Sequence, residues 1–377
     1  MTPVAAPLRV LMTIDAVGGV WHYATTLVEA LARLDRARSV EFLLACIGPA
    51  PSIAQQRAVA ALPRVRLVHR PYRLEWMDDP WDDVARAGRW LGECAADFRP
   101  DLVHLNGYVH AALQWRVPVL VVGHSCVLSW WEAVRGEPAP AACEPYRRAV
   151  ARGLAHARSV VAPTHAMLSA LERHYGLPED RHVISNGAFL ARFAPGVKEA
   201  IVMAAGRVWD EGKNLAALDA AARNLSWPVY VAGDARHPSG GAVVARSYNA
   251  LGALPPDRLR AWIARAMIYA LPARYEPFGL SALEAAAAGC ALVLGDIPSL
   301  REVWGDAAVF VDPDRPMALS AAIAGLMDDP ARRELFATRA SARARRFSAE
   351  RMARRYAEIY ADLAPLGGGL AQLTRTT

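Results

Sequence analysis

Two carboxylates flank a glycine in the segment EPFGLSALE, where Glu276 and Glu284 lie on either side of Gly279. The apolar run AMIYALPARY before the segment predicts a strand, and SALEAAAAG predicts a helix that ends at Gly289. Helical side chains lean toward the helix N-terminus, so Glu284 can reach the same mouth as Glu276. Carboxylates there could bind sugar hydroxyls, and the N–H groups of Gly279 and Leu280 could bind phosphate at the helix start. The segment therefore suits a sugar nucleotide, although Ser281 to Glu284 is also a capping-box pattern.

Two cations are expected at a second strand-to-helix corner, in AAGRVWDEGKN. Arg207 closes an apolar strand, and Lys213 stands just before the helix expected from Asn214. The chain has only one other lysine, Lys198, so a lysine at this corner is not explained by general usage. Fixed cations could hold a diphosphate and stabilise the charge that grows on it as a sugar–phosphate bond breaks. A solvated surface pair is the alternative.

A histidine and a glycine pair end two strands of the first half. His124 closes PVLVVGH at the carboxyl edge of the predicted sheet, where it could lie near a ligand or be buried and bonded to the backbone. Gly18 and Gly19 form the turn between RVLMTI and the helix expected from Val20. Without a Cβ they let the backbone approach a ligand closely, although such a pair can also be an ordinary turn.

Strands alternate with helices in both halves of the chain, on either side of a break at ARFAPGVKEA. This alternation indicates parallel sheets with right-handed crossovers, whose ligands lie at the carboxyl ends of the strands. We predict an N-terminal domain over residues 1–190, a C-terminal domain over 198–347, and a closing helix within 348–377 that could pack back on the first domain before a frayed tail. The predicted strands are RVLMTI, VEFLLACIG, VRLVHR, DLVHLNG, PVLVVGH, RSVVAPT and HVISNG, then AIVMAAGR, VYVAGD, MIYALP, ALVLGD and AAVFVDP. The predicted helices cover residues 21–34, 81–97, 214–225, 256–266, 281–289, 330–347 and 348–363.

Composition narrows the class of protein. Hydrophobic content of 54% and charged content of 21% are typical of a globular chain, and no window holds the roughly 18 apolar residues of a membrane span. The start of the chain has no secretory signal pattern, and the five cysteines form no CxxC motif, so we expect reduced core thiols in the cytoplasm. The net charge of +6 is spread over both halves, which argues against a nucleic-acid surface but is compatible with peripheral contact at the inner face of an anionic membrane.

The motifs together resemble family 4 glycosyltransferases. The segments that carry the resemblance are AAGRVWDEGKN, EPFGLSALEAAAAG and the later Glu302, with DAVGGVWHYATTLVEAL, PVLVVGHS and VISNGAF in the expected order, so it covers nearly the whole chain. It implies the GT-B fold, in which two Rossmann-like domains face each other across a cleft. It also implies transfer of a sugar from a nucleoside diphosphate donor, held by the second domain, with retention at the anomeric carbon. The acceptor, a glycan, lipid-linked or small molecule, would lie on the first domain, and no cofactor or metal is expected.

The resemblance assigns a role to each candidate residue. The first glutamate of the pair would contact the transferred sugar and the second the ribose hydroxyls, while the two cations hold the diphosphate and the glycine turn covers it or shapes the acceptor site. The implied catalytic residues are His124, Arg207, Lys213 and Glu276. The implied donor-binding residues are Gly18, Gly19, Arg207, Lys213, Glu276, Phe278, Gly279, Leu280 and Glu284. The acceptor loops are expected around Gly18–His22, RLEWMDDPWDD and Ser125–Trp131.

Several other patterns stay open. Trp21, Trp130 and Trp131 could stack on a sugar or pack in the protein. Asp312-Pro-Asp314 resembles a DxD metal site of another fold, but its proline favours a type I turn. Ala291 and the segment GDIPSLREVW depart from the family pattern near the leaving phosphate.

Four rival functions share parts of this pattern: a sugar-nucleotide epimerase, a phosphorylase, an NAD-dependent oxidoreductase and a non-catalytic sugar-nucleotide-binding protein. The chain has no GxGxxG fingerprint after a strand, which counts against the oxidoreductase. Neither lysine suits the pyridoxal group of a phosphorylase, since Lys198 lies in the predicted linker and Lys213 beside the phosphate.

Overall fold

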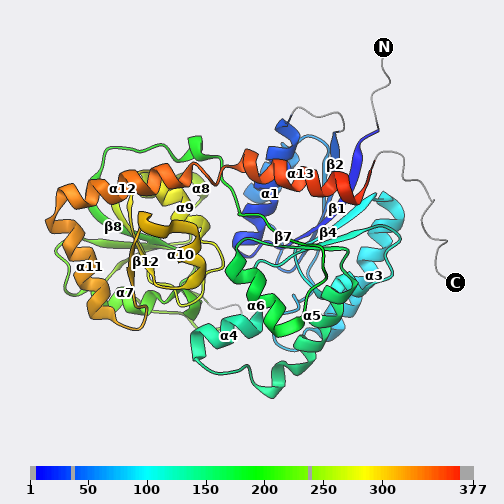
Figure 1. The fold of residues 1–377 in the computed structure, drawn as a ribbon, viewed down its shortest axis with the longest axis horizontal. Coiled ribbons are helices and arrows are strands. Elements are labelled where there is room, and N and C mark those ends of the chain that lie inside the picture. The colour runs from blue at the N-terminus through cyan, green and yellow to red at the C-terminus, as the bar shows by residue number, and fades with distance from the viewer. Residues whose placement is uncertain (1–5, 35–38, 237–239, 366–377) are drawn as a thin grey trace, which may run out of the picture.

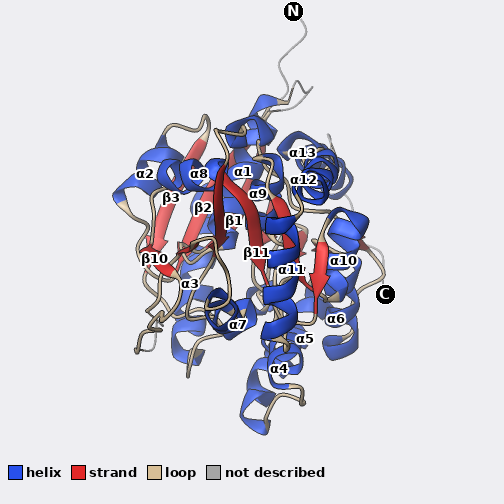
Figure 2. Cartoon of the chain, turned by 90° about the vertical axis from the view of Figure 1, so that its left-hand side faces the viewer, coloured by secondary structure: helices blue, strands red, loops and turns tan. Residues whose placement is uncertain are grey.

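The chain forms two α/β units that lie next to each other (Figure 1). The computed structural model describes residues 6–34, 39–236 and 240–365. Each unit contains one sheet of parallel strands with helices on both faces, and Figure 2 shows the strands inside and the helices outside. We call the unit around the earlier sheet the first domain and the other the second domain.

The first domain contains a seven-stranded sheet with the order β3-β2-β1-β4-β5-β6-β7. All its strand pairs are parallel, as the alternation of strands and helices predicts. Its strands are β1 (Leu8–Ile14), β2 (Val40–Ile47), β3 (Val65–Arg70), β4 (Leu102–Leu105), β5 (Val119–Val122), β6 (Ser159–Ala162) and β7 (Arg181–Val183). Its helices are α1 (Gly19–Arg33), α2 (Ile53–Ala60), α3 (Trp81–Phe98), α4 (Val127–Arg135), α5 (Glu144–His156) and α6 (His165–Tyr175), with short 3-10 turns η1 (Val109–Ala112), η2 (Ala141–Cys143) and η3 (Leu190–Phe193).

The second domain contains a six-stranded parallel sheet with the order β10-β9-β8-β11-β12-β13. Its strands are β8 (Glu199–Ala205), β9 (Val229–Ala232), β10 (Asn249–Gly252), β11 (Ala266–Leu271), β12 (Ala291–Gly295) and β13 (Val309–Val311). Its helices are α7 (Leu215–Ala222), α8 (Pro256–Arg265), α9 (Leu280–Ala287), α10 (Pro298–Trp304), α11 (Pro316–Asp328) and α12 (Pro330–Ala344), with 3-10 turns η4 (Glu211–Lys213) and η5 (Gly305–Ala307). The last helix, α13 (Ala349–Leu363), follows α12.

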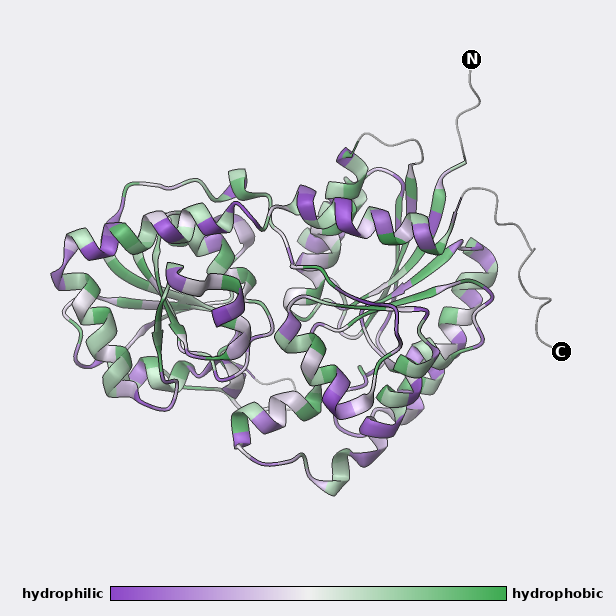
Figure 3. Ribbon diagram, viewed as in Figure 1, coloured by the Kyte–Doolittle hydropathy of each residue, from purple (hydrophilic) through white to green (hydrophobic). Residues whose placement is uncertain are grey.

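Each sheet is buried on both faces, which explains why its strands read as continuous apolar runs rather than as alternating ones. On β1, Val10 and Met12 pack into one core cluster, while Leu11 packs into the cluster on the opposite face. The second sheet is likewise covered by separate clusters on its two faces. Figure 3 shows the hydrophobic strands inside and the hydrophilic residues gathered on the outer helices. Each domain therefore has a core of its own.

The chain crosses between the domains twice. After the last strand of the first sheet it passes through η3 to β8, within the segment expected as a linker. It returns after α12, and α13 then packs on the first domain beside α1, where Met352, Tyr356 and Tyr360 join the core (Figure 1). The two crossings are hydrogen-bonded to each other: Ala188 N–H donates to Phe347 O at 3.1 Å, and Ala349 N–H donates to Ala188 O at 2.9 Å. The predicted frayed tail lies outside the described residues.

Some elements were not among the predicted ones, namely α2, α4, α5, α6, α10, α11 and β10. All five cysteines are free thiols, as expected, but Cys94 and Cys143 are only partly buried and so are not core residues.

Gly153 on α5 marks a close contact that predicts a loss of stability. A Cβ at this position would lie 2.1 Å from the carbonyl oxygen of Tyr108, which is far too close. Gly153→Ala should therefore lower the free energy of unfolding by about 2–3 kcal/mol, because helix α5 must move away from the backbone it packs on. Gly92 on α3 is the matched control, since a Cβ there meets nothing within 4 Å. Gly92→Ala should raise the free energy of unfolding by about 0.5–1 kcal/mol. Urea unfolding of both variants measures the difference, and equal values would contradict the contact.

Candidate functional site

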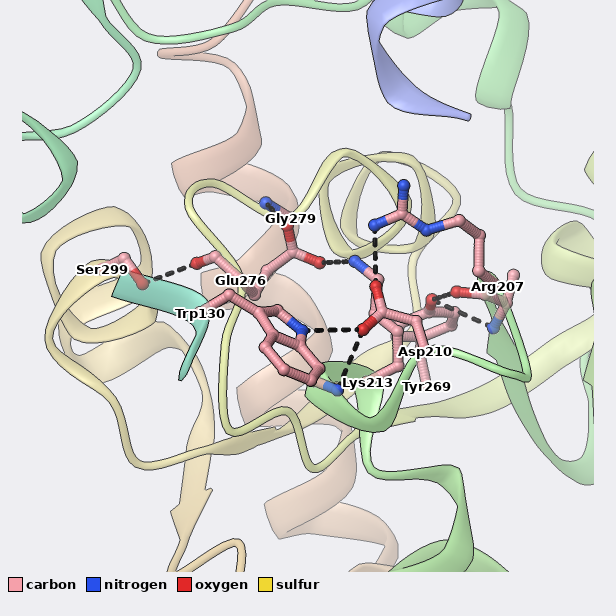
Figure 4. A network of polar contacts seen from close by, with 10 residues as sticks. Trp130, Arg207, Asp210, Lys213, Tyr269, Glu276, Gly279 and Ser299 are labelled. Atoms are coloured by element: carbon pink, nitrogen blue, oxygen red, sulfur yellow. Dashed lines mark hydrogen bonds and ion pairs between the residues drawn. The ribbon is translucent and has the colours of Figure 1, made fainter. Parts of the chain in front are cut away.

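A buried ion pair joins the two predicted corners of the second domain. The ammonium of Lys213, at the end of η4, contacts Oε2 of Glu276, which follows β11 (Figure 4). The other carboxylate oxygen of Glu276 accepts a hydrogen bond from the N–H of Gly279 at 3.1 Å, and Ser299 Oγ–H donates to the Glu276 carbonyl at 2.6 Å. Glu276 is only 8% exposed, so its charge depends on these partners.

The loop after Glu276 turns sharply into α9. Gly279 has a φ of +91°, a conformation that favours glycine, and α9 begins at Leu280. Ser281 therefore lies inside the helix, and the capping-box interpretation of Ser281 and Glu284 is wrong. The side chain of Phe278 is buried in the core of the second domain, with its ring 5.5 Å from that of Phe347. Only its backbone is available to a ligand.

Glu284 faces the first domain from the second turn of α9. Its Oε1 lies 3.2 Å from Nε2 of His22, which belongs to α1 of the first domain. Burial raises the pKa of Glu284 to about 7, and the charge of Arg260 opposes this rise only partly. The carboxyl group therefore changes its charge near neutral pH.

Arg207 is the second cation of the site. Its Nη2 donates to Oδ2 of Asp210 at 2.7 Å, and its guanidinium lies over the Trp209 ring. Gly18 of the first domain, with a φ of +82°, stands opposite: a Cβ there would lie 3.5 Å from Nη1 of Arg207. The neighbouring Gly19 would place a Cβ 4.0 Å from Leu280. The glycine turn thus meets both the arginine and the start of α9 across the domain boundary.

His124 lies after β5 at the carboxyl edge of the first sheet. Its Nε2 is 2.8 Å from Oδ1 of Asn106, and the Asn106 amide is oriented by donating to Thr13 O at 2.7 Å. Because Oδ1 can only accept, Nε2 carries the hydrogen and Nδ1 is left as an acceptor. Burial lowers the pKa of His124 to about 3, so the ring is neutral at pH 7. The edge of Tyr23 packs against it, with the ring centroids 4.4 Å apart.

A pocket opens in the first domain beside this histidine, at the carboxyl ends of β1, β2 and β4. Asn106 lines the pocket and also bonds to His124, so the pocket and His124 are adjacent. The loop after β3 closes the pocket; its Glu75 accepts hydrogen bonds from the N–H groups of Tyr108 and Val109, which fixes the carboxylate. The side chains with polar groups on its wall are Thr13, Asp15, Arg73, Glu75, Trp76, Asn106 and His110.

Contacts between the domains hold the opposite side of the site. The hydroxyl of Tyr275 accepts from Cys126 N–H at 3.1 Å and shares a hydrogen bond with Ser129 Oγ at 2.8 Å. Glu302 caps α6 by accepting from the N–H groups of His165 and Ala166, at 2.8 and 3.0 Å. Glu302 therefore joins the domains in this arrangement.

The segment GDIPSLREVW, which was expected to depart from the family pattern, contains the whole of α10. It supplies both Glu302 and the hydroxyl of Ser299 that binds Glu276. Through Ser299, helix α10 supports the Glu276 loop.

The three tryptophans all make contacts within the protein. Trp21 is buried in the first core, and the Trp130 indole N–H donates to Asp210 at 3.1 Å. Trp131 packs against Trp130, with the ring centroids 6.2 Å apart.

The residues Asp312 to Arg315 form a turn, in which Arg315 N–H donates to Asp312 O at 3.1 Å. This confirms the turn interpretation of the DxD-like segment, and Asp314 pairs with Arg274. Across the described residues, no three His, Cys, Asp or Glu side chains gather where they could hold a metal ion. In the same part of the chain, no helix has the length and apolar character needed to cross a bilayer.

The structure brings together, around one gap between the domains, the predicted Gly18, Gly19, Arg207, Lys213, Glu276, Gly279, Leu280 and Glu284. Sequence reasoning missed Asp210, Asn106 and Tyr275, and it placed His22 only in an expected acceptor loop. Two of these carried a signal. Asp210 stands three residues after Arg207 in the same loop, and Tyr275 directly precedes Glu276. Nothing in the sequence indicated that Asn106 would orient His124.

Both halves of the chain match family models. Residues 17–192 match the family described as Glycosyltransferase Family 4, and residues 197–343 match Glycosyl transferases group 1. The chain is 30% identical to the D-inositol 3-phosphate glycosyltransferase of Xylanimonas cellulosilytica over 95% of its own length and 94% of the relative. It is 39% identical to the O-antigen chain mannosyltransferase B of Escherichia coli, but over only 26% of each chain.

Solved structures share the fold over nearly the whole chain. Sucrose-phosphate synthase from Thermosynechococcus elongatus superimposes with a TM-score of 0.79 at 19% identity, covering 94% of this chain and 99% of that one. Anabaena HepE, solved in complex with UDP and glucose, gives a TM-score of 0.75 at 16% identity, with 94% and 100% covered. At such identities the likeness concerns the fold.

Proposed function

The chain belongs to the family 4 glycosyltransferases and has their GT-B fold; we propose that it moves a sugar from a nucleoside diphosphate donor to an acceptor with retention at the anomeric carbon. The observation that carries the proposal is the meeting of Lys213 and Glu276 beside Arg207 at the strand ends of the second domain. Cations for a diphosphate and a carboxylate for a sugar hydroxyl thus share one site.

The donor diphosphate would lie against Arg207 and Lys213. Both side chains come from the corner after β8, and helix α9, whose first N–H groups could also bind phosphate, begins at Leu280. Negative charge grows on the diphosphate as the sugar leaves, and preorganised cations stabilise it without needing to rearrange. Since these groups supply the positive charge, the proposal includes no metal ion.

The sugar would lie between Glu276 and His124. Glu276 could accept from a sugar hydroxyl once the diphosphate shares Lys213, and the free Nδ1 of neutral His124 could accept another. The acceptor oxygen would attack the anomeric carbon on the face that the diphosphate leaves. The carbon–oxygen bond to phosphate breaks, and the departing phosphate oxygen takes the acceptor's proton. This route needs no covalent nucleophile.

The acceptor would occupy the pocket beside His124 in the first domain. Its wall combines Asp15, Glu75 and Asn106, whose polar groups could bind hydroxyls, with the partly exposed Trp76 ring. One of the expected acceptor loops contributes, through Arg73, Glu75 and Trp76 of the segment after β3, whereas no residue of Gly18–His22 or Ser125–Trp131 lines the pocket. HepE was solved with UDP-glucose, so UDP-sugars are the first donors to test. A lipid-linked acceptor would bring the chain to a membrane surface, which its net charge of +6 would favour where the lipids are anionic.

A thermal-shift panel of UDP-, GDP- and ADP-sugars tests the proposal, because a ligand that binds only the folded state raises the melting temperature. One donor should give a clear rise, and the same donor should be consumed when candidate acceptors are added. Release of an altered sugar nucleotide without an acceptor would indicate the epimerase instead. Binding without any turnover would indicate a non-catalytic binding protein, and no shift with any nucleotide would contradict the whole proposal.

The raised pKa of Glu284 predicts pH-dependent donor binding. Only the ionised carboxylate can accept from both ribose hydroxyls, and with a pKa of about 7 this form is depleted below neutral pH. Donor affinity should therefore be about tenfold weaker at pH 6 than at pH 8. Calorimetry with the nucleotide sugar selected by the panel measures this, since a nucleotide sugar has no phosphate that titrates in this range. Glu284→Gln should bind more weakly and with a flat pH profile, and a slope retained in this variant would exclude Glu284 as its source.

A further inference from the structure

Asp210 connects three parts of the molecule through one carboxylate (Figure 4). Its Oδ2 accepts from Arg207 Nη2 at 2.7 Å. Its Oδ1 accepts from the Trp130 indole N–H at 3.1 Å and from the N–H of Gly212 at 2.9 Å. The side chain is 8% exposed, so its orientation is determined by these donors and not by water. Trp130 is the only one of these three donors that belongs to the first domain, because it lies on α4.

Asp210 remains an anion despite its burial. Burial would raise its pKa, but the charges of Arg207 and Lys213 and the hydrogen bonds from Arg207 and Trp130 outweigh this effect and hold the pKa below its usual value. A buried anion one hydrogen bond away from Arg207 has two consequences. It fixes the direction of the guanidinium, and it competes with any phosphate for the same cation. The hydrogen bonds that Oδ1 accepts hold the carboxylate in place and weaken its competition with phosphate for Arg207.

Arg207 has further donors for a ligand. Its Nε is buried and has no hydrogen-bond partner within the described residues, while its side chain as a whole is 39% exposed. An unsatisfied buried N–H is costly unless a ligand satisfies it. The direction of the guanidinium therefore decides whether this N–H and Nη1 point at the donor.

The Trp130 contact exists only when the domains are together. Next to it, Arg135 on α4 forms a bidentate pair with Glu211, with distances of 2.7 and 2.8 Å, so α4 is held against η4 in this arrangement. If the first domain moved away, Asp210 would lose the indole N–H and keep only Gly212 on Oδ1.

We propose that Trp130 is a positioning residue, whose indole N–H fixes Asp210 and thereby directs Arg207 at the donor diphosphate only after the first domain closes on the second. This inference rests on the proposed function, since it takes Arg207 as the diphosphate cation. It couples domain closure to the charge stabilisation of the leaving group. A donor bound to the second domain alone would meet a less ordered arginine and would react more slowly with stray water.

The neighbouring Trp131 offers a matched control. Its indole N–H is buried but has no hydrogen-bond partner in the described structure, and it lies on the same helix. Trp130→Phe and Trp131→Phe therefore remove the same chemical group, and only the first breaks a hydrogen bond to a charged partner. Melting temperatures of both variants check that they fold.

The experiment measures release of nucleoside diphosphate from UDP-glucose, or from the GDP- or ADP-sugar that gives the largest thermal shift, without added acceptor. Trp130→Phe should lower kcat about tenfold, the effect of losing one hydrogen bond to a charged group. The KM for the donor and the Kd for the free nucleoside diphosphate should change less than about twofold, because initial binding uses the second domain. Trp131→Phe should change none of the three beyond about twofold.

Two outcomes would overturn the inference: unchanged kcat in Trp130→Phe, or an equal loss in Trp131→Phe, which would show a packing effect. If Trp130→Phe does not fold, Asp210→Asn tests the same link, and its kcat should fall by at least the same factor. Arg207→Gln distinguishes a failure of the proposed donor site from a failure of the positioning role of Trp130. If it leaves the Kd for the nucleoside diphosphate unchanged, the proposed donor site is wrong; if it weakens binding while Trp130→Phe has no effect on kcat, only the positioning role fails.

Discussion

Glu276→Gln is expected to lower the rate of sugar transfer at least 100-fold while leaving nucleoside diphosphate binding intact or tighter. The carboxylate accepts from Gly279 N–H and pairs with Lys213, so it neutralises a cation that the diphosphate would use. The amide is of similar size and cannot provide the negative charge for the sugar hydroxyl or for the developing positive charge on the anomeric carbon. It also leaves the ammonium of Lys213 free for phosphate.

Steady-state kinetics and calorimetry with the nucleoside diphosphate measure the two effects separately. Glu284→Gln is the comparison, because it changes the other carboxylate of the same segment and should weaken donor binding first. Turnover within a few fold of the original protein in Glu276→Gln would exclude Glu276 from the reaction. Transfer lost together with all nucleotide binding would instead point to a damaged loop.

Lys213→Met should lower transfer about 1,000-fold and weaken nucleoside diphosphate binding about tenfold. Methionine keeps much of the apolar stem but removes the charge that stabilises the leaving diphosphate. It also leaves Glu276 as a buried carboxyl group without its cation, so the melting temperature should fall.

The only other lysine of the chain serves as the control for this substitution. Lys198 is partly buried, and its Nζ donates to the carbonyls of Ala266 and Ala288 at 2.7 Å each, away from the site. Lys198→Met should reduce thermal stability through these unsatisfied carbonyls but leave turnover per folded molecule unchanged. Activity within about fivefold of the original in Lys213→Met would rule out its phosphate role.

The strands of both sheets could be predicted because burial on two faces makes them apolar without interruption. Val10, Leu11 and Met12 on β1 are all fully buried, so neither face needs a polar residue. The helices α4, α5 and α6 escaped prediction. Gly153 inside α5 is a local signal against a helix, whereas Pro145 lies in the first turn, where proline is favoured. Their stability comes from packing on the first sheet, which a local pattern does not reveal.

The sequence predicted which residues belong to the site better than it predicted which of them contact one another. Glu276 and Lys213 were expected to serve different parts of the donor, yet in this structure each is the other's partner across 63 positions of sequence. Trp130 was expected to stack or pack, and its indole N–H instead reaches Asp210. Such contacts depend on how the domains meet, and no spacing within one segment encodes that geometry.

The paired crossings between the domains limit how the molecule can move. A single connecting segment would let one domain rotate freely relative to the other. Here the backbone of Ala188 is hydrogen-bonded to Phe347 and Ala349 of the returning chain. Two connections that are hydrogen-bonded to each other act as a hinge, which permits bending between the domains and resists rotation about the connection. Each opening would therefore separate the same surfaces of the two domains, and each closure would return them to the same relative orientation.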